Sequence, residues 1–194
     1  MGCGDKSQRE FSRPLLFFDQ RESSNCGDIV SPMAKIPRII GVISDTHGLL
    51  RPEALVALGG SDLIIHAGDV GKPEILDELK AIAPLFVVRG NVDNGEWAKQ
   101  LPTKEIVAFD GATIYILHNL HELHVDPDAV GFDAVITGHT HKVHEYRKGK
   151  VLFLNPGSSG PQRFDLPITV ARLHVEKVPW RFEIIRLQPN KKSQ

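Results

Sequence analysis

The chain has 194 residues, which suits one domain with a sizeable core, and its 41% hydrophobic and 24% charged residues are ordinary for a globular protein. Its 23 basic and 24 acidic residues give a formal net charge of -1, which argues against nucleic acid as a partner, because nucleic-acid binding needs a basic face. With only Cys3 and Cys26, and no apolar run that could span a bilayer, we expect no disulfide framework, no membrane partner and a cytoplasmic location.

Residues 1–35 differ from the rest of the chain. They are rich in Gly, Ser, Arg, Asp and Gln, and they show neither helical nor strand periodicity. We predict a disordered N-terminal extension there, and a start codon assigned too early is the alternative. Residues 36–188 are predicted to form the globular domain and 189–194 a short C-terminal tail.

Strands and helices are predicted to alternate from Ile36 onward. A proline near its start predicts a short helix at 52–58, and apolar residues at helical spacing predict another at 73–82. Runs of β-branched and other apolar residues predict buried strands at 38–44, 63–66, 85–88, 112–117 and 134–137. After Lys142, β-rich segments separated by turn residues predict an antiparallel half with strands at 143–146, 151–154, 169–175 and 180–187.

Polar residues of metal-ligand type follow each of the five buried strands. In α/β sheets, binding sites form at the carboxyl ends of the strands, so we expect these side chains to converge. In chain order they are Asp45 and His47, Asp69, Asn91, His118, and His139 with His141.

Four imidazoles, two carboxylates and one amide oxygen suit first-row metals such as Mn, Fe, Co, Ni or Zn. Seven ligands exceed what one catalytic ion takes, whereas two ions that share a carboxylate would use all of them. Gly68, Gly90 and Gly138 each precede a candidate ligand, and we expect them to allow a sharp turn and the close approach of metal or phosphate.

These motifs carry a resemblance to a known family. The segments 44–48 (SDTHG), 68–69 (GD), 90–93 (GNVD), 137–141 (TGHTH) and 155–158 (NPGS), with His118, occur in the order found in calcineurin-like metallophosphoesterases. Over about residues 36–188 the chain resembles more narrowly the small YfcE-type phosphodiesterases. The resemblance implies an α/β fold of four layers, an αββα sandwich, with a dinuclear site between the sheets.

The resemblance also implies a division of the ligands. Asp45, His47 and His141 would hold one ion, Asp69 would bridge, and Asn91, His118 and His139 would hold the other. The resemblance implies two divalent transition-metal ions as cofactors. Manganese is the favoured metal, and nickel, cobalt, iron and zinc are the alternatives. It further implies hydrolysis of a small phosphorylated molecule, most simply a phosphodiester, by a hydroxide bound between the ions. The resemblance leaves open whether the chain forms a homo-oligomer.

Two positions depart from the wider pattern. Many larger members of the superfamily have a histidine that protonates the leaving group directly after the Gly-Asn motif. This chain has Val92 there, and the small YfcE-type members commonly lack that histidine too. Asn119 replaces the glycine usual after the fourth-strand histidine, which leaves the local path around His118 open. Beyond the ligands, the candidates for supporting or substrate-binding roles are Asp93, His121, Asn155 and Ser158, while His66 is expected in the core or beside the ligands.

The alternative function belongs to another class. A retromer subunit shares this fold and acts mainly through protein contacts, so a non-catalytic interaction scaffold is the rival hypothesis. In such a scaffold some of the ligands should have been replaced, and because all seven are present we favour the enzyme. A nuclease is disfavoured by the near-neutral charge.

Overall fold

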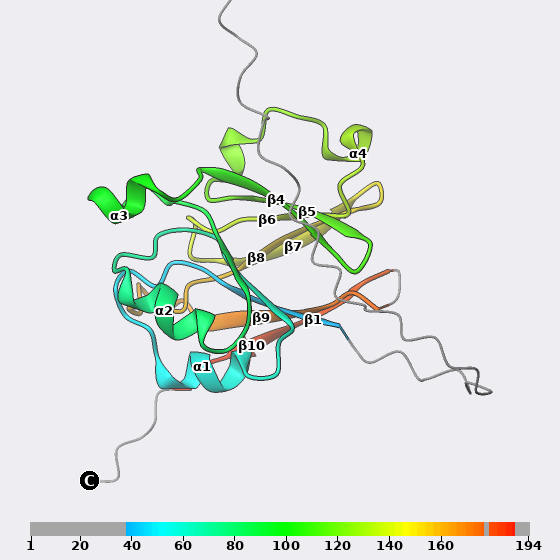
Figure 1. Cartoon of the computed structure of the whole chain (residues 1–194). Coiled ribbons are helices and arrows are strands. Elements are labelled where there is room, and N and C mark those ends of the chain that lie inside the picture. The colour runs from blue at the N-terminus through cyan, green and yellow to red at the C-terminus, as the bar shows by residue number, and fades with distance from the viewer. Residues whose placement is uncertain (1–37, 177–178, 189–194) are drawn as a thin grey trace, which may run out of the picture.

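The computed structural model describes residues 38–176 and 179–188, which form two five-stranded sheets packed face to face (Figure 1). The predicted extension at 1–35 and the predicted tail at 189–194 lie outside these ranges, so the domain boundaries stay a prediction. In the described ranges the longest helices have seven residues, and none is long and apolar enough to cross a membrane.

The first sheet has the strand order β10-β9-β1-β2-β3. β1, β2 and β3 are parallel, whereas β9 runs antiparallel to both β1 and β10. The helices α1 and α2 connect the parallel strands and cover the outer face of this sheet, where Leu58 and Leu79 pack with Ile43 and Ile64. The bounds are β1 Ile39–Ile43, α1 Pro52–Leu58, β2 Leu63–His66, α2 Glu74–Lys80, β3 Leu85–Val87, β9 Thr169–His174 and β10 Arg181–Arg186.

The second sheet has the order β4-β5-β6-β8-β7. β5, β6 and β8 are parallel, and the edge strands β4 and β7 are antiparallel to their neighbours. The predicted antiparallel half is therefore correct for the pairs β7–β8 and β9–β10 but wrong for β8, which lies parallel to β6. The bounds are β4 Lys104–Phe109, β5 Ala112–Leu117, β6 Ala134–Ile136, β7 Val143–Lys148 and β8 Val151–Pro156.

The main core lies between the two sheets. Ile40 and Val42 of β1 and Ile114 and Ile116 of β5 belong to the same fully buried cluster, while alternate residues of these strands face the outer layers. Burial on both faces explains why the strands are continuous apolar runs rather than alternating ones. The four-layer prediction is confirmed, although among the described residues the outer layer on the second sheet consists of η1 (Leu120–Glu122) and α4 (Pro127–Val130) alone.

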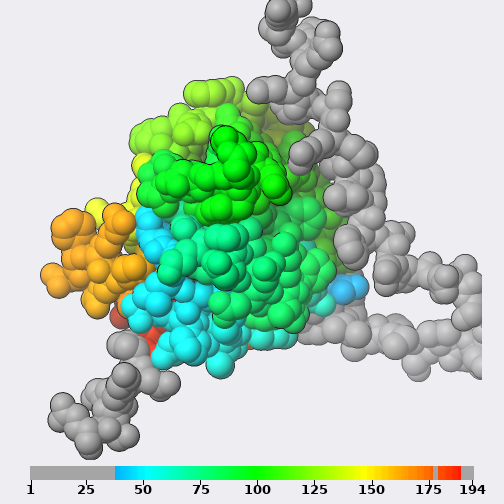
Figure 2. All heavy atoms as spheres, turned by 60° about the vertical axis from the view of Figure 1, so that its left-hand side comes forward, coloured from blue at the N-terminus to red at the C-terminus, as the bar shows by residue number. Residues whose placement is uncertain are grey.

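The connections differ from the prediction more than the strands do. The short helix α3 (Glu96–Lys99), β4, η1 and α4 were not predicted, whereas α1, β2 and β5 have the predicted bounds. The connection between β8 and β9, orange in Figure 2, projects from the molecule beside the segment that follows β1.

Candidate metal centre

The seven candidate ligands meet where the carboxyl ends of β1, β2, β3, β5 and β6 come together. Hydrogen bonds join the two sheets at this edge: the backbone N–H of His139 donates to the carboxylate of Asp45 at 3.1 Å, and Nδ1 of His118 lies 2.7 Å from the carbonyl oxygen of Ala67. As expected from the sequence, all seven side chains converge, and they form two adjoining groups.

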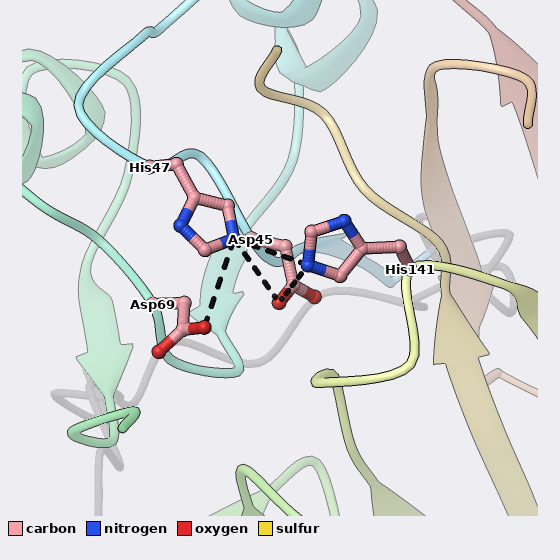
Figure 3. Close-up of side chains that lie close together, drawn as sticks. All are labelled: Asp45, His47, Asp69 and His141. Atoms are coloured by element: carbon pink, nitrogen blue, oxygen red, sulfur yellow. Dashed lines mark hydrogen bonds and ion pairs between the residues drawn. The ribbon is translucent and has the colours of Figure 1, made fainter. Parts of the chain in front are cut away.

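The first group consists of Asp45, His47 and His141 (Figure 3). The two Nε2 atoms of His47 and His141 are 3.1 Å apart, and Oδ1 of Asp45 lies 3.3 Å from Nε2 of His141 and 3.9 Å from Nε2 of His47. Together with Asp69, these residues offer ligand atoms that all lie within 4.8 Å of one another. Such a set of imidazoles and carboxylates is suited to a transition metal.

The second group consists of Asn91, His118 and His139. Oδ1 of Asn91 lies 3.0 Å from Nε2 of His118 and 2.9 Å from Nδ1 of His139. Asp69 lies between the groups, because its Oδ2 is 3.6 Å from Nε2 of His47 and 3.4 Å from Nε2 of His118. One carboxylate oxygen therefore faces both groups.

The donor chemistry of the second group fits a bound cation. The carbonyl of Ala67 only accepts hydrogen bonds, so Nδ1 of His118 donates to it, and in the neutral ring Nε2 then carries a lone pair. That lone pair faces two oxygens, Oδ1 of Asn91 and Oδ2 of Asp69. Three acceptors directed at one another need a proton or a metal ion among them.

The backbone is strained at most of these positions. Five of the seven candidates have a left-handed φ, and these are Asp45 (54°), His47 (46°), Asp69 (57°), His139 (72°) and His141 (60°). Among the other described non-glycine residues only Asp110 and Phe164 share this conformation. Each such residue costs about 1–3 kcal/mol, and residues of this kind cluster at functional sites.

The glycines before the ligands allow other parts of the site to approach the backbone closely. A Cβ atom on Gly90 would collide with the backbone and carboxylate of Asp69, and one on Gly138 would collide with the hydroxyl of Ser44. The group that approaches each of these two glycines is therefore another part of the site. Glycine at these positions lets the strand ends pack closely enough for their side chains to converge.

Three of the four supporting candidates make contacts that hold the ligand loops. Asp93 accepts hydrogen bonds from the backbone N–H groups of Gly71 and Gly90, both at 2.8 Å. Asn155 donates to the carbonyl of Gly138 at 2.6 Å, and Ser158 donates to the carbonyl of Asp45 at 3.0 Å.

The fourth candidate, His121, lies exposed on η1, and among the described residues its side chain forms no hydrogen bond with the ligands. The side chain of Asn119 accepts a hydrogen bond from the backbone N–H of His121 and so caps η1. Replacing the usual glycine by Asn119 therefore shapes the turn after His118 while His118 keeps its place in the second group.

The surroundings shift the pKa values of His47, His118 and Asp69 in different directions. Burial lowers the pKa of His47, and Arg163 adds to this effect, which outweighs the opposite influence of Asp69 and Asp45. Burial also lowers the pKa of His118, but its interactions with Asp69 and the carbonyl of Ala67 prevail and raise it above the ordinary value. For Asp69, burial raises the pKa, but His118 and the N–H of Val92 lower it overall, so this carboxylate is held ionised.

Ser44 and Thr46, which were not predicted as site residues, also support the ligands. Ser44 donates a 2.6 Å hydrogen bond to Oδ2 of Asp45. Thr46 lies 2.9 Å from Nε2 of His66 and donates to the carbonyl of Val70 at 2.9 Å, so it ties the loop after β1 to the loop after β2. Their place next to Asp45 and His47 was the available signal, since a buried hydroxyl beside a ligand needs a partner.

Comparison with known proteins agrees with this geometry. The family model of the calcineurin-like phosphoesterase superfamily domain matches residues 39–178. A probable metallophosphoesterase from Methanothermobacter thermautotrophicus is 34% identical over 76% of this chain and 92% of its own length.

Solved structures are similar as well. A novel archaeal phosphodiesterase has a TM-score of 0.64 and 26% identity, covering 76% of this chain and 99% of that one. Vacuolar protein sorting 29 from Cryptosporidium parvum has a TM-score of 0.62 at 18% identity, covering 77% and 98%, and this likeness concerns the fold alone. The resemblance inferred from the motifs is confirmed, and the chain belongs to the calcineurin-like phosphoesterase superfamily.

Proposed function

We propose that this protein is a phosphodiesterase that hydrolyses a small phosphorylated molecule with two divalent transition-metal ions, manganese first and nickel, cobalt, iron or zinc as alternatives. The supporting observation is the convergence of seven donor side chains from five strand ends, with Oδ2 of Asp69 between the two groups. Membership of the superfamily supports metal-dependent hydrolysis, and the name of the similar archaeal structure supports a phosphodiester as the substrate.

Asp45, His47 and His141 would hold one ion, Asn91, His118 and His139 the other, and Asp69 would contact both. Two such ions, when bound, lower the pKa of a water molecule and neutralise charge on the phosphate oxygens. The substrate phosphate would lie over the exposed side of the seven ligands, where His139 is accessible to solvent.

Neighbouring groups of the chain orient the ligands Asp45, Asp69 and His118. Asp45 and Asp69 each have one oxygen held in place and the other directed at the site: Ser44 holds Oδ2 of Asp45, and the N–H of Val92 holds Oδ1 of Asp69 at 3.0 Å. The carbonyl of Ala67 fixes the ring of His118 in the same way. Partners of this kind fix ligand geometry before a metal arrives.

The scaffold alternative is disfavoured by the same details. A protein that acts only through surface contacts has no need of seven converging donors or of five left-handed backbone positions that cost free energy. The likeness to vacuolar protein sorting 29 does not decide between the two functions, because a shared fold does not imply a shared activity.

The test is an activity panel on protein stripped of metal by a chelator and reloaded with Mn, Ni, Co, Zn or Mg. We expect bis(p-nitrophenyl) phosphate to be hydrolysed faster than p-nitrophenyl phosphate, and only with a transition metal. Activity should increase as the pH rises through about 6.5, because the imidazoles must be neutral to bind metal. Full activity after exhaustive chelation would contradict the proposal, and a fully loaded but inactive protein would favour the scaffold.

A further inference from the structure

The connection between β8 and β9 is anchored beside the candidate metal centre at its start and closed by a β-bridge at its end. Near its start, the N–H of Gly160 donates to the carbonyl of Asp45 at 3.2 Å, and Arg51 donates to the carbonyl of Gly160 at 3.2 Å. At its end, Ile168 forms a β-bridge with Ser158. The residues between these anchors form a short projecting loop beside the loop that carries Asp45 and His47 (Figure 2).

Arg163 lies in this projecting loop, within reach of the ligands. It lines one small hollow together with His141 and Ser158. It is also close enough to His47 for its positive charge to contribute to the lowered pKa of that ring. The N–H of Leu166 donates to the carbonyl of Arg163 at 3.3 Å, so the backbone at this position is part of a turn.

Arg163 is exposed, and within residues 38–176 and 179–188 its guanidinium forms no hydrogen bond or ion pair. The two carboxylates of the site, Asp45 and Asp69, are buried and face the histidines. A cation beside a group of metal ligands is repelled by any metal that binds there. An anion bound between the guanidinium and the metal would remove this repulsion. Phosphate suits this position because a guanidinium can donate two parallel hydrogen bonds to phosphate oxygens.

We propose that Arg163 binds a non-bridging oxygen of the substrate phosphate and so sets the affinity of the site for phosphate esters. This inference rests on the proposed function for its substrate, but it concerns a residue outside the ligand set. It predicts that the loop between β8 and β9 forms one wall of the substrate site, with Arg163 as its phosphate-binding group.

The test compares Arg163→Ala and Arg163→Lys with two controls. Phe164→Ala changes the neighbouring residue, which is 91% exposed and does not line the hollow, and Lys80→Ala removes one positive charge on α2. The readouts are KM for bis(p-nitrophenyl) phosphate, binding of inorganic phosphate to the metal-loaded protein by calorimetry, and the metal content per chain.

We expect Arg163→Ala to raise KM and the Kd for phosphate by about tenfold to a hundredfold, the range for a hydrogen bond to a charged group. Arg163→Lys should recover part of the loss, both controls should match the wild type, and no variant should lose metal. Unchanged phosphate binding in Arg163→Ala, an equal loss in Phe164→Ala, or a loss of metal would overturn the inference. If the wild type hydrolyses no phosphate ester, the proposed function fails, while phosphate calorimetry still tests Arg163.

Discussion

The hydroxyl of Thr46 lies 2.9 Å from Nε2 of His66, and this contact settles which nitrogen of the buried ring carries the proton. The N–H of Gly68 donates to Nδ1 of His66, and Thr46 donates its own proton to the carbonyl of Val70. Nε2 of the neutral ring is therefore the donor to Thr46. The chain of hydrogen bonds runs from the loop after β2 through the core to the loop that carries Asp45 and His47.

This arrangement predicts an acid-sensitive fold. Burial lowers the pKa of His66 to about 4, against the raising effect of Asp93 and Asp45. The unfolded chain, with a histidine pKa of about 6.5, then binds the proton first, so stability is complete above about 6.5 and is lost as the pH falls towards 4. Between pH 7 and 5 the loss due to His66 should be about 2 kcal/mol.

His66→Gln should be less stable than the wild type at pH 7 but should lose less on acidification. Urea unfolding of the metal-free proteins at pH 7 and 5 measures both effects, provided that the m-values agree. Equal losses in the two proteins would show that His66 does not contribute to the pH dependence.

Asp69 should matter more for metal binding than Asn91, because its Oδ2 faces both groups while Asn91 faces one. Asp69→Ala should lose metal from both positions and Asn91→Ala from one, and both should lose more than about a hundredfold in kcat. Metal analysis of the purified proteins checks this, with Asp77→Ala on α2, an exposed acid, as the control. Two ions per chain in Asp69→Ala would show that the bridge is assigned wrongly.

Asp93 joins two ligand loops without facing the ligands, so its loss should weaken metal binding indirectly. Asp93→Ala leaves the N–H groups of Gly71 and Gly90 without their acceptor, and we expect metal affinity to fall by about tenfold to a hundredfold. Competition with a fluorescent chelator measures the affinity, and Asn94→Ala, an exposed neighbour, should leave it unchanged. An unaltered affinity in Asp93→Ala would mean that the loops keep their shape without this carboxylate.

Val92 cannot donate a proton through its side chain, and it lies half-exposed where larger members of the superfamily have a general acid. General acid catalysis contributes about a hundredfold to ten-thousandfold. Without it, the rate should depend steeply on the pKa of the leaving group. A series of aryl phosphodiesters with graded leaving groups tests this on wild type, His121→Gln and His124→Gln.

A shallow dependence in the wild type that steepens in one variant would identify that histidine as the acid. The structure makes His124 the weaker candidate, because it lines a separate hollow with Tyr146 and Phe153 of the second sheet. A steep dependence in all three proteins is the expected result.

Removal of residues 1–33 should leave the protein folded and active. They carry none of the candidate ligands and lack apolar periodicity. A chain that begins at Ala34 should unfold at the same temperature and have the same kcat as the full chain. A large decrease in either would show that the N-terminal segment packs on the domain or reaches the site.

The central strands β2, β6 and β8 could be predicted from the sequence because they are buried on both faces. β4 could not be predicted in this way, since this edge strand begins with Lys104 and Glu105 and only Val107 is fully buried. A signal was nevertheless present: Asp110 and Gly111, both with positive φ, form the two-residue turn between β4 and β5, and Asp-Gly is a strong hairpin signal. The helices α3 and α4 are too short to show a period.

The candidate ligands could be predicted because each follows a buried strand, but their orientation could not. Ser44 orients Asp45 as its direct neighbour, a contact that the sequence could have suggested. Asp69 and His118 are oriented by the backbone N–H of Val92 and the carbonyl of Ala67, which lie far from them in the sequence. Neither periodicity nor residue type records such contacts.

The left-handed backbone at Asp45, His47, Asp69, His139 and His141 has a consequence for the evolution and engineering of the chain. Glycine would relax the main chain at each of these positions, yet glycine has no side chain that could bind a metal. Random mutation followed by selection for heat resistance alone should therefore enrich glycine at these five positions and yield robust but inactive proteins. Only selection that also demands turnover would retain the strained residues. Selection for activity and selection for thermal stability should therefore favour different residues at these five positions.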